Sequence, residues 1–159
     1  LIKYIDYIPK TFAVYEVKKF DWKNKKIFNT SKKYYAVDLG LTNFYKPSVN
    51  NFTKQLENLV FLKLSQEFNF NEINYGYSQN REIDIITSSK ENKITKYQIT
   101  QTLNHENRER EFASFKQEDK FINQGENILL SLDEDEEEIK LGENKVKRIN
   151  LLKWLVLGQ

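Results

Sequence analysis

Apolar residues recur along the chain with two different periods, one typical of helices and the other of strands. From Phe52 to Phe68 they lie three and four positions apart and form a wide apolar stripe, which predicts a well-buried helix. A second, more charged helix is predicted over Glu106 to Phe121, with its phenylalanines on one side. Short runs of apolar and aromatic residues predict strands near residues 12–17, 27–28, 33–38, 73–77, 82–87, 95–100, 127–132 and 145–150. Strands that alternate with helices predict an α/β fold in which one sheet is covered on both faces.

Two consecutive predicted strands, 82–87 and 95–100, carry the most informative polar residues. Successive side chains of a strand point to opposite faces, so each strand should present three residues on one face: Glu82, Asp84 and Ile86 on the first, and Lys96, Gln98 and Thr100 on the second. If residues 88–94 form a hairpin turn, Asp84 lies opposite Gln98, with about 5 Å between the two side chains. Both side chains would then reach one divalent cation.

Glu57 stands out within the long apolar helix, because Val60 and Phe61 follow it one turn later on its own side. A carboxylate in such a place needs a partner, since burial of an unpaired charge is strongly unfavourable. One interpretation is a salt bridge, or an edge position from which the carboxylate reaches water. The other is a contact to a metal ion or a substrate. The helix alone leaves both open.

Metal-dependent cleavage of a phosphodiester requires oxygen ligands for Mg²⁺ or Mn²⁺. It usually also requires a lysine that orients the attacking water and offsets negative charge. Glu57, Asp84 and Gln98 are the candidate ligands, with Gln98 offering only a neutral carbonyl oxygen. The sequence therefore contains most of a nuclease-type metal site, with one negative charge fewer than usual.

The lysine of such a site is missing, because Thr100 stands where it is expected. Two lysines are candidate replacements for it: Lys96, on the same predicted face, and Lys54, on the long helix. Both are also candidate contacts to nucleic acid. A purely structural alternative for Asp84 is an ion pair, for example with Arg81. The residues alone leave the catalytic and the structural interpretation open.

Other charged segments bear on nucleic-acid binding. Arg108 and Arg110, near the start of the second helix, are candidate phosphate contacts. Their alternative is pairing within the helix, for example of Arg108 with Glu111. The acidic run from Asp133 to Glu138 predicts a solvated loop, which would repel a nucleic-acid backbone and should lie away from any binding groove.

Composition narrows the class of protein without selecting a function. The 159 residues are 39% hydrophobic, which suffices for one core. Lys and Arg number 25 and Asp and Glu 23, and a net charge of +2 excludes a strongly basic nucleic-acid binder. The chain has no cysteine and a single histidine, which excludes disulfides and the usual zinc sites. It contains neither a membrane-spanning apolar run nor a signal-peptide pattern, so we expect a soluble, cytoplasmic protein.

Five short segments together carry a resemblance to a known family. They are Lys32 to Leu41, Leu56 to Phe61, Arg81 to Asp84, Tyr97 to Thr100, and Ile149 to Leu155. In this order and with this spacing they resemble the C-terminal domain of a large group of prokaryotic AAA-type P-loop ATPases. That domain is of unknown function and belongs with the PD-(D/E)xK nuclease-like folds. The resemblance covers about residues 30–157.

The resemblance implies a three-layer α/β/α, restriction-endonuclease-like fold with a mixed central sheet over residues 31–159. It implies that residues 1–30 are the end of a winged-helix-like region that links this domain to an ATPase module upstream. The chain itself contains no G-x-x-x-x-G-K-[ST] sequence and therefore no ATP site. Because it begins at Leu1 and contains no methionine, we expect it to be a piece of a longer protein.

The resemblance also assigns positions in the site. Glu57, Asp84 and Gln98 fall at the acidic-site positions of the family, where Mg²⁺ or Mn²⁺ would bind, and Thr100 falls where active nucleases carry lysine. One resulting interpretation is an accessory domain of degenerate nuclease-like fold that recognises nucleic acid or a protein partner without efficient cleavage. A second is an active Mg²⁺- or Mn²⁺-dependent nuclease, and a third is a docking or homo-oligomerisation module for the ATPase. The missing lysine and the near-neutral charge favour the first.

Overall fold

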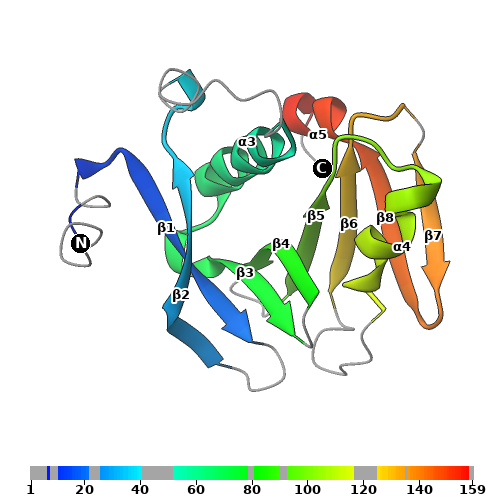
Figure 1. Cartoon of the computed structure of the whole chain (residues 1–159), viewed down its shortest axis with the longest axis horizontal. Coiled ribbons are helices and arrows are strands. Elements are labelled where there is room, and N and C mark those ends of the chain that lie inside the picture. Colours follow the sequence, from blue (N-terminus) through cyan, green and yellow to red (C-terminus); the bar gives the residue numbers. More distant parts are fainter. Residues whose placement is uncertain are drawn as a thin grey trace.

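The computed structural model describes residues 7, 11–21, 26–40, 52–78, 81–89, 93–116, 125–134 and 136–157. Within these residues one eight-stranded sheet has the strand order β2-β1-β3-β4-β5-β6-β8-β7 (Figure 1). The elements are β1 (Val14–Asp21), β2 (Lys26–Ala36), α3 (Phe52–Glu67), the 3-10 turn η3 (Phe70–Glu72), β3 (Ile73–Ser78), β4 (Arg81–Ser88), β5 (Ile94–Ile99), α4 (His105–Ala113), β6 (Glu126–Ser131), β7 (Glu137–Leu141), β8 (Asn144–Asn150) and α5 (Leu151–Leu157).

Helices cover both faces of this sheet. On one face, buried residues of α3 and α5 form the main core with the strands, and Phe61 and Trp154 are its largest helical members. On the other face, Phe112 of α4 and the following Phe115 pack on Leu129 and Val146. The pairs β1·β3, β5·β6 and β6·β8 are parallel and the others antiparallel. The expected three-layer α/β/α fold with a mixed central sheet is therefore confirmed.

The long apolar stripe forms α3 as predicted, with Leu56, Val60, Phe61 and Leu64 buried. The charged helix is shorter than its pattern suggested. α4 begins after Asn104, whose side chain accepts hydrogen bonds from the backbone N–H groups of Glu106 and Asn107, and it ends at Ala113. The last part of the predicted helix, residues 117–121, lies outside the described residues.

The first strands belong to the central sheet. β1 pairs with β2 along its length and runs parallel to β3, with Lys19 opposite Tyr75. β2 extends from Lys26 to Ala36 and so runs across the domain boundary expected after residue 30. The described part of the expected winged-helix-like segment is thus a hairpin of the same sheet, whereas its helical pattern in residues 1–6 and 8 lies outside the described residues.

Strand β4 contains a bulge, and beyond it the side chains point to the opposite face of the sheet from the one predicted. One residue of β3, Tyr75, faces two residues of β4, Asp84 and Ile85, because the register shifts at this point. Ile85 packs in the core under α3, whereas Ile86 joins Ile83 in a separate cluster. The prediction that Asp84 shares a face with Ile86 is therefore wrong, because simple alternation holds only without a bulge.

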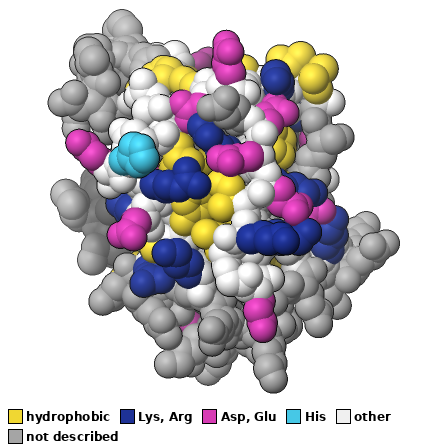
Figure 2. All heavy atoms as spheres, turned by 90° about the vertical axis from the view of Figure 1, so that its right-hand side faces the viewer, with side chains coloured by type: hydrophobic (Ala, Val, Ile, Leu, Met, Phe, Trp, Pro, Cys, Tyr) yellow, Lys and Arg dark blue, Asp and Glu magenta, His cyan; other side chains and the backbone are white. Residues whose placement is uncertain are grey.

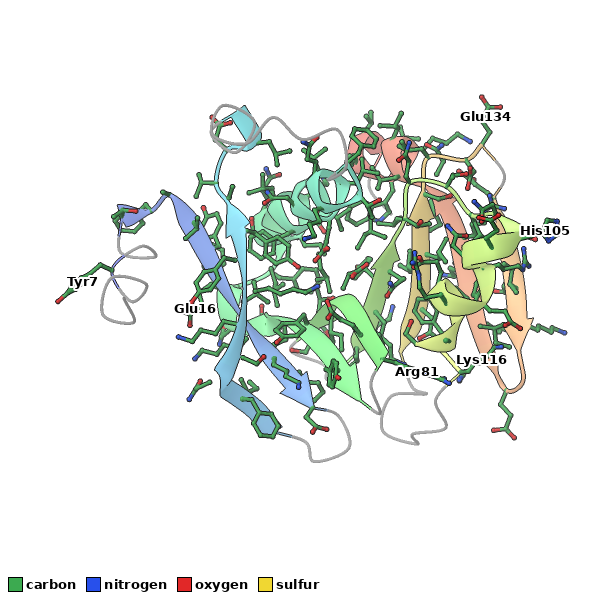
Figure 3. The ribbon with its side chains drawn as sticks, in the orientation of Figure 1. Tyr7, Glu16, Arg81, His105, Lys116 and Glu134 are labelled. Atoms are coloured by element: carbon green, nitrogen blue, oxygen red, sulfur yellow. The ribbon has the colours of Figure 1, made fainter. Side chains whose placement is uncertain are left out.

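The acidic run is not one solvated loop. Its first residue, Asp133, is hydrogen-bonded to Thr102 and to the backbone of Leu103 and pairs with Arg148, whereas Glu134 points into solvent (Figure 3). Glu137 and Glu138 open strand β7, which pairs antiparallel with β8. The described part of the run thus combines one anchoring carboxylate with an exposed edge strand. None of the described helices combines the length and apolarity needed to cross a membrane.

A tight contact between Gly125, the residue before β6, and Ile94 of β5 gives a first testable prediction. A Cβ atom on Gly125 would overlap the backbone carbonyl of Ile94, so Gly125→Ala is expected to cost about 2–3 kcal/mol of unfolding free energy. Urea denaturation measures this loss. Gly142→Ala is the matched control: a Cβ there meets no atom within 4 Å, and its positive φ of 64° should cost only about 1 kcal/mol. Equal losses in the two variants would contradict the close approach.

Candidate functional site

The candidate site is formed by side chains of the strands β2 and β4 and of the helix α3, three elements labelled in Figure 1. Lys33 and Tyr35 come from β2, Glu57 from α3, and Glu82 and Asp84 from β4. The bulge in β4 turns Asp84 toward the α3 face, and the two-residue spacing of Lys33 and Tyr35 places both on the same face of β2. Three elements distant in sequence thus bring five polar side chains together.

Glu57 has two partners from β2. Its Oε1 accepts a hydrogen bond of 2.6 Å from the Tyr35 hydroxyl and one of 2.8 Å from the Lys33 ammonium. The Tyr35 ring is itself fixed in the core, stacked on Phe61 at 4.3 Å between ring centroids. Of the two interpretations of Glu57, the structure shows the salt bridge. Tyr35 and Lys33 satisfy a carboxylate that is only 14% exposed.

The Lys33 ammonium lies among three carboxylates. Its Nζ is 2.8 Å from Glu57, 2.5 Å from Glu82 and 3.7 Å from Asp84, and it also lies over the Tyr75 ring. Burial by itself would lower the pKa of Lys33, but the three negative charges outweigh burial and raise this pKa above its ordinary value. Lys33 is therefore protonated at every physiological pH.

Asp84 is held by the backbone of the neighbouring strand, since the N–H of Ile99 donates a 2.9 Å hydrogen bond to its Oδ2. Burial, together with the nearby charge of Glu57, raises the pKa of Asp84 to about 7. The ammonium of Lys33 and the Ile99 hydrogen bond oppose this rise without cancelling it. Asp84 therefore exchanges its proton near neutral pH.

Gln98 is directed away from this group. The paired register of β4 and β5 ends at Ile85 opposite Tyr97, so Asp84 and Gln98 are the next positions along the two strands. Tyr97 packs in the core under α3, and alternation turns Gln98 to the α4 face, where its Nε2 donates to Glu111 at 3.1 Å. The expected convergence of Asp84 and Gln98 on one cation is therefore not found.

The other predicted site residues are spread over the molecule. The Thr100 hydroxyl donates to the carbonyl of Thr102, and Lys96 is buried beside the Ile86 position of β4. Lys54 is exposed on the first turn of α3. Neither lysine replaces the one missing at position 100.

Three predicted site or pairing residues, Arg81, Arg108 and Arg110, lie on or beside α4, as does His105. Arg81 donates to the carbonyl of Ala113 rather than to Asp84, and His105 points outward from the helix (Figure 3). Arg108 lies over the Phe112 ring, and Arg110 pairs with Glu111. On this side of the molecule, lysine and arginine side chains lie around a hydrophobic patch with carboxylates between them (Figure 2).

The residues do not fit the divalent metal ion that the resemblance implies. Mg²⁺ requires oxygens at about 2.0–2.1 Å in near-octahedral array, whereas the carboxylates here surround an ammonium. Among the described residues, no three His, Cys, Asp or Glu side chains form a group suited to a metal. Gln98, the third expected ligand, lies on the other face of the sheet, where its Nε2 donates to Glu111.

Lys33 is the site residue that the sequence reasoning missed. Two signals pointed to it: Lys33 and Tyr35 share a face of a predicted strand, and Glu57 needed a partner. Only the fold shows that these two facts concern one contact, because 24 positions separate Lys33 from Glu57.

Asp84 gives a second prediction, of a pH-dependent gain in stability. Its folded-state pKa of about 7 lies above its ordinary value of 3.8, so its ionisation destabilises the folded state progressively from pH 4 to 7. Asp84→Asn keeps an oxygen for the Ile99 N–H and is expected to raise the unfolding free energy by about 1–3 kcal/mol at pH 8, with little effect at pH 4. Urea denaturation at both pH values measures the change, and a loss of stability at pH 8 would contradict it.

Comparison with curated proteins gives distant relatives. The chain is 32% identical over 85 residues to an uncharacterized protein of Haemophilus influenzae, covering 53% of this chain and 21% of the relative. It is 30% identical over 117 residues to an uncharacterized protein of Methanocaldococcus jannaschii, covering 72% of this chain and 25% of the relative. The chain thus spans about a quarter or less of the length of these relatives. No family model and no solved structure matches it.

Proposed function

We propose that this chain is an accessory domain of a P-loop ATPase, with a degenerate PD-(D/E)xK nuclease-like fold that recognises nucleic acid or a protein partner without efficient cleavage. The main support for this proposal is that Lys33 pairs with the carboxylates Glu57, Glu82 and Asp84 of the candidate site. Gln98 and Thr100 make other contacts, so the described residues supply neither a metal cage nor a lysine at position 100. The three-layer fold and the longer relatives support a domain within a larger protein.

Exposed arginines on α4 are the proposed nucleic-acid contacts. Arg110 has a side chain 77% exposed, and Arg108 is also exposed. Each lysine or arginine that neutralises a phosphate adds a salt-dependent contribution to affinity. Buried Lys96 is no longer a candidate contact, whereas Lys54, exposed on α3, remains one.

The test is to incubate the chain with labelled single- and double-stranded DNA and RNA in Mg²⁺ or Mn²⁺, and to measure binding and cleavage together. We expect salt-sensitive binding that Arg108→Ala combined with Arg110→Ala weakens, and no cleavage above that of Asp84→Asn. Cleavage that Asp84→Asn abolishes would contradict the proposal and make the chain an active nuclease. In that case Lys33, the cation nearest Asp84, would be the first candidate for the missing lysine.

A docking module is the second candidate function, and helix α5 favours it. Leu152, Val156 and Leu157 are 57%, 81% and 77% exposed, although each is apolar. Leu157 also lines a cavity of about 310 Å³, together with Trp154 of the same helix. Exposed apolar side chains of this kind are typical of contact surfaces. Absence of nucleic-acid binding, with self-association that Val156→Asp abolishes, would support this candidate over the first.

A further inference from the structure

The carboxylates of the candidate site already hold a cation, and that cation is part of the chain. Lys33 contacts Glu57, Glu82 and Asp84, and among the described residues it is the one lysine paired with three carboxylates. Other lysines of the same hairpin are placed differently. Lys32 pairs with Glu16, and Lys19 lies over the Tyr77 ring.

The position of Lys33 is fixed by the sheet. It is opposite the buried Val17 in the β1·β2 register, and its ammonium lies 5.3 Å from the centroid of the Tyr75 ring. Its side chain is only 21% exposed, so the ammonium is directed inward rather than into solvent. A cation tethered in this way competes with dissolved ions at a high effective concentration.

The carboxylates need such a cation. Glu57 and Asp84 have side chains only 14% exposed, and two like charges in a partly buried place repel each other strongly. The ammonium of Lys33 offsets this repulsion from a central position. A divalent ion entering the site would have to displace it and break the 2.8 Å contact to Glu57.

We propose that Lys33 is the cation of this site, built into β2 in place of the divalent metal ion that a nuclease of this fold would bind, and that its ammonium keeps such ions out. This inference deepens the proposed function, since it explains why a nuclease-like fold would not cleave, and it rests on that function for its biological meaning. Its physical content concerns metal binding alone and can be tested without any nucleic acid.

The experiment compares Mn²⁺ binding to the wild-type chain and to Lys33→Met, by calorimetry and by the shift of the thermal midpoint. Lys33→Met leaves three carboxylates without their cation and free to move together around a metal ion. Its Mn²⁺ affinity is expected to exceed that of the wild type by at least about tenfold, since carboxylate charge sets the affinity of such sites. Lys33→Met is also expected to melt lower than the wild type and to recover part of the difference in Mn²⁺. The matched control is Lys32→Met, which removes a neighbouring lysine paired with Glu16 and should gain no Mn²⁺ binding.

Two results would overturn the inference. One is saturable Mn²⁺ binding by the wild type that Asp84→Asn abolishes, and this measurement does not depend on the folding of any Lys33 variant. The other is a folded Lys33→Met chain with no greater affinity for Mn²⁺ than the wild type. If Lys33→Met unfolds, Lys33→Gln replaces it in the same comparison. Failure of nucleic-acid binding would remove nucleic-acid recognition from the proposed function and leave this inference standing, so the two failures are distinguishable.

Discussion

Replacing Asp133 by alanine is expected to lower the free energy of unfolding by about 3–4 kcal/mol at pH 7, because it leaves a buried arginine without its main partner. Asp133 accepts hydrogen bonds of 2.6 Å from the Thr102 hydroxyl and 2.8 Å from the Leu103 backbone, and it pairs with Arg148 at 2.8 Å. The Arg148 side chain is only 8% exposed. These contacts tie the segment after β5 to β8, so their loss affects both strands.

The effect of Asp133 should depend on pH. Partial burial raises its pKa, but the hydrogen bonds from Thr102, Leu103 and Arg148 outweigh burial and lower the pKa to about 2, below the ordinary 3.8. A lowered folded-state pKa contributes stability above the unfolded-state value, and this contribution is lost as the pH falls from about 4 to 2. The difference between the wild type and Asp133→Ala should therefore shrink over that range, measured by urea denaturation at pH 7, 4 and 2.5.

Glu138→Ala is the control, since it removes another carboxylate of the same acidic run. Glu138 is half-exposed on β7 and pairs with the exposed Lys145, a geometry in which ion pairs contribute little. Its replacement should leave stability nearly unchanged. A loss in Asp133→Ala no larger than that in Glu138→Ala would show that the Arg148 contact does not anchor the sheet.

The elements predicted well from sequence are those whose own residues determine their burial. The apolar stripe of α3 and the continuous apolar run of β6 are both buried in the structure. Their sequence patterns alone therefore indicate a buried helix and a buried strand. Strand β7 is different. It is a charged edge strand that is stabilised by its pairing with β8, and its residues Glu137 and Glu138 are typical of a loop.

The candidate site was only partly predictable, because its geometry depends on contacts between distant strands. The bulge that turns Asp84 toward α3 is a property of the β3·β4 register and leaves no mark in the sequence of β4. The direction of Gln98 follows from alternation once Tyr97 is known to be buried under α3. The acidic positions at Glu57 and Asp84 were identified from sequence and do lie together, whereas the cation between them comes from β2.

Phe61→Ala is expected to lower the free energy of unfolding by about 3–5 kcal/mol, the usual cost of emptying a fully buried phenylalanine site. Phe61 has no solvent exposure and lies near two tyrosine rings, stacked on Tyr35 at 4.3 Å with 9° between the planes and tilted against Tyr15 at 5.6 Å. The cavity would remove the support of Tyr35, whose hydroxyl holds Glu57. Urea denaturation measures the loss.

The matched control for this change is Phe70→Ala. Phe70 also stacks on Tyr15, at 4.7 Å, but it is 52% exposed, so its removal creates no enclosed cavity and should cost only about 1 kcal/mol. Tyr35→Phe separates the two roles of Tyr35, because it keeps the ring against Phe61 and removes only the hydrogen bond to Glu57. A loss in Phe61→Ala no larger than that in Phe70→Ala would contradict the expected cost of an enclosed cavity at Phe61.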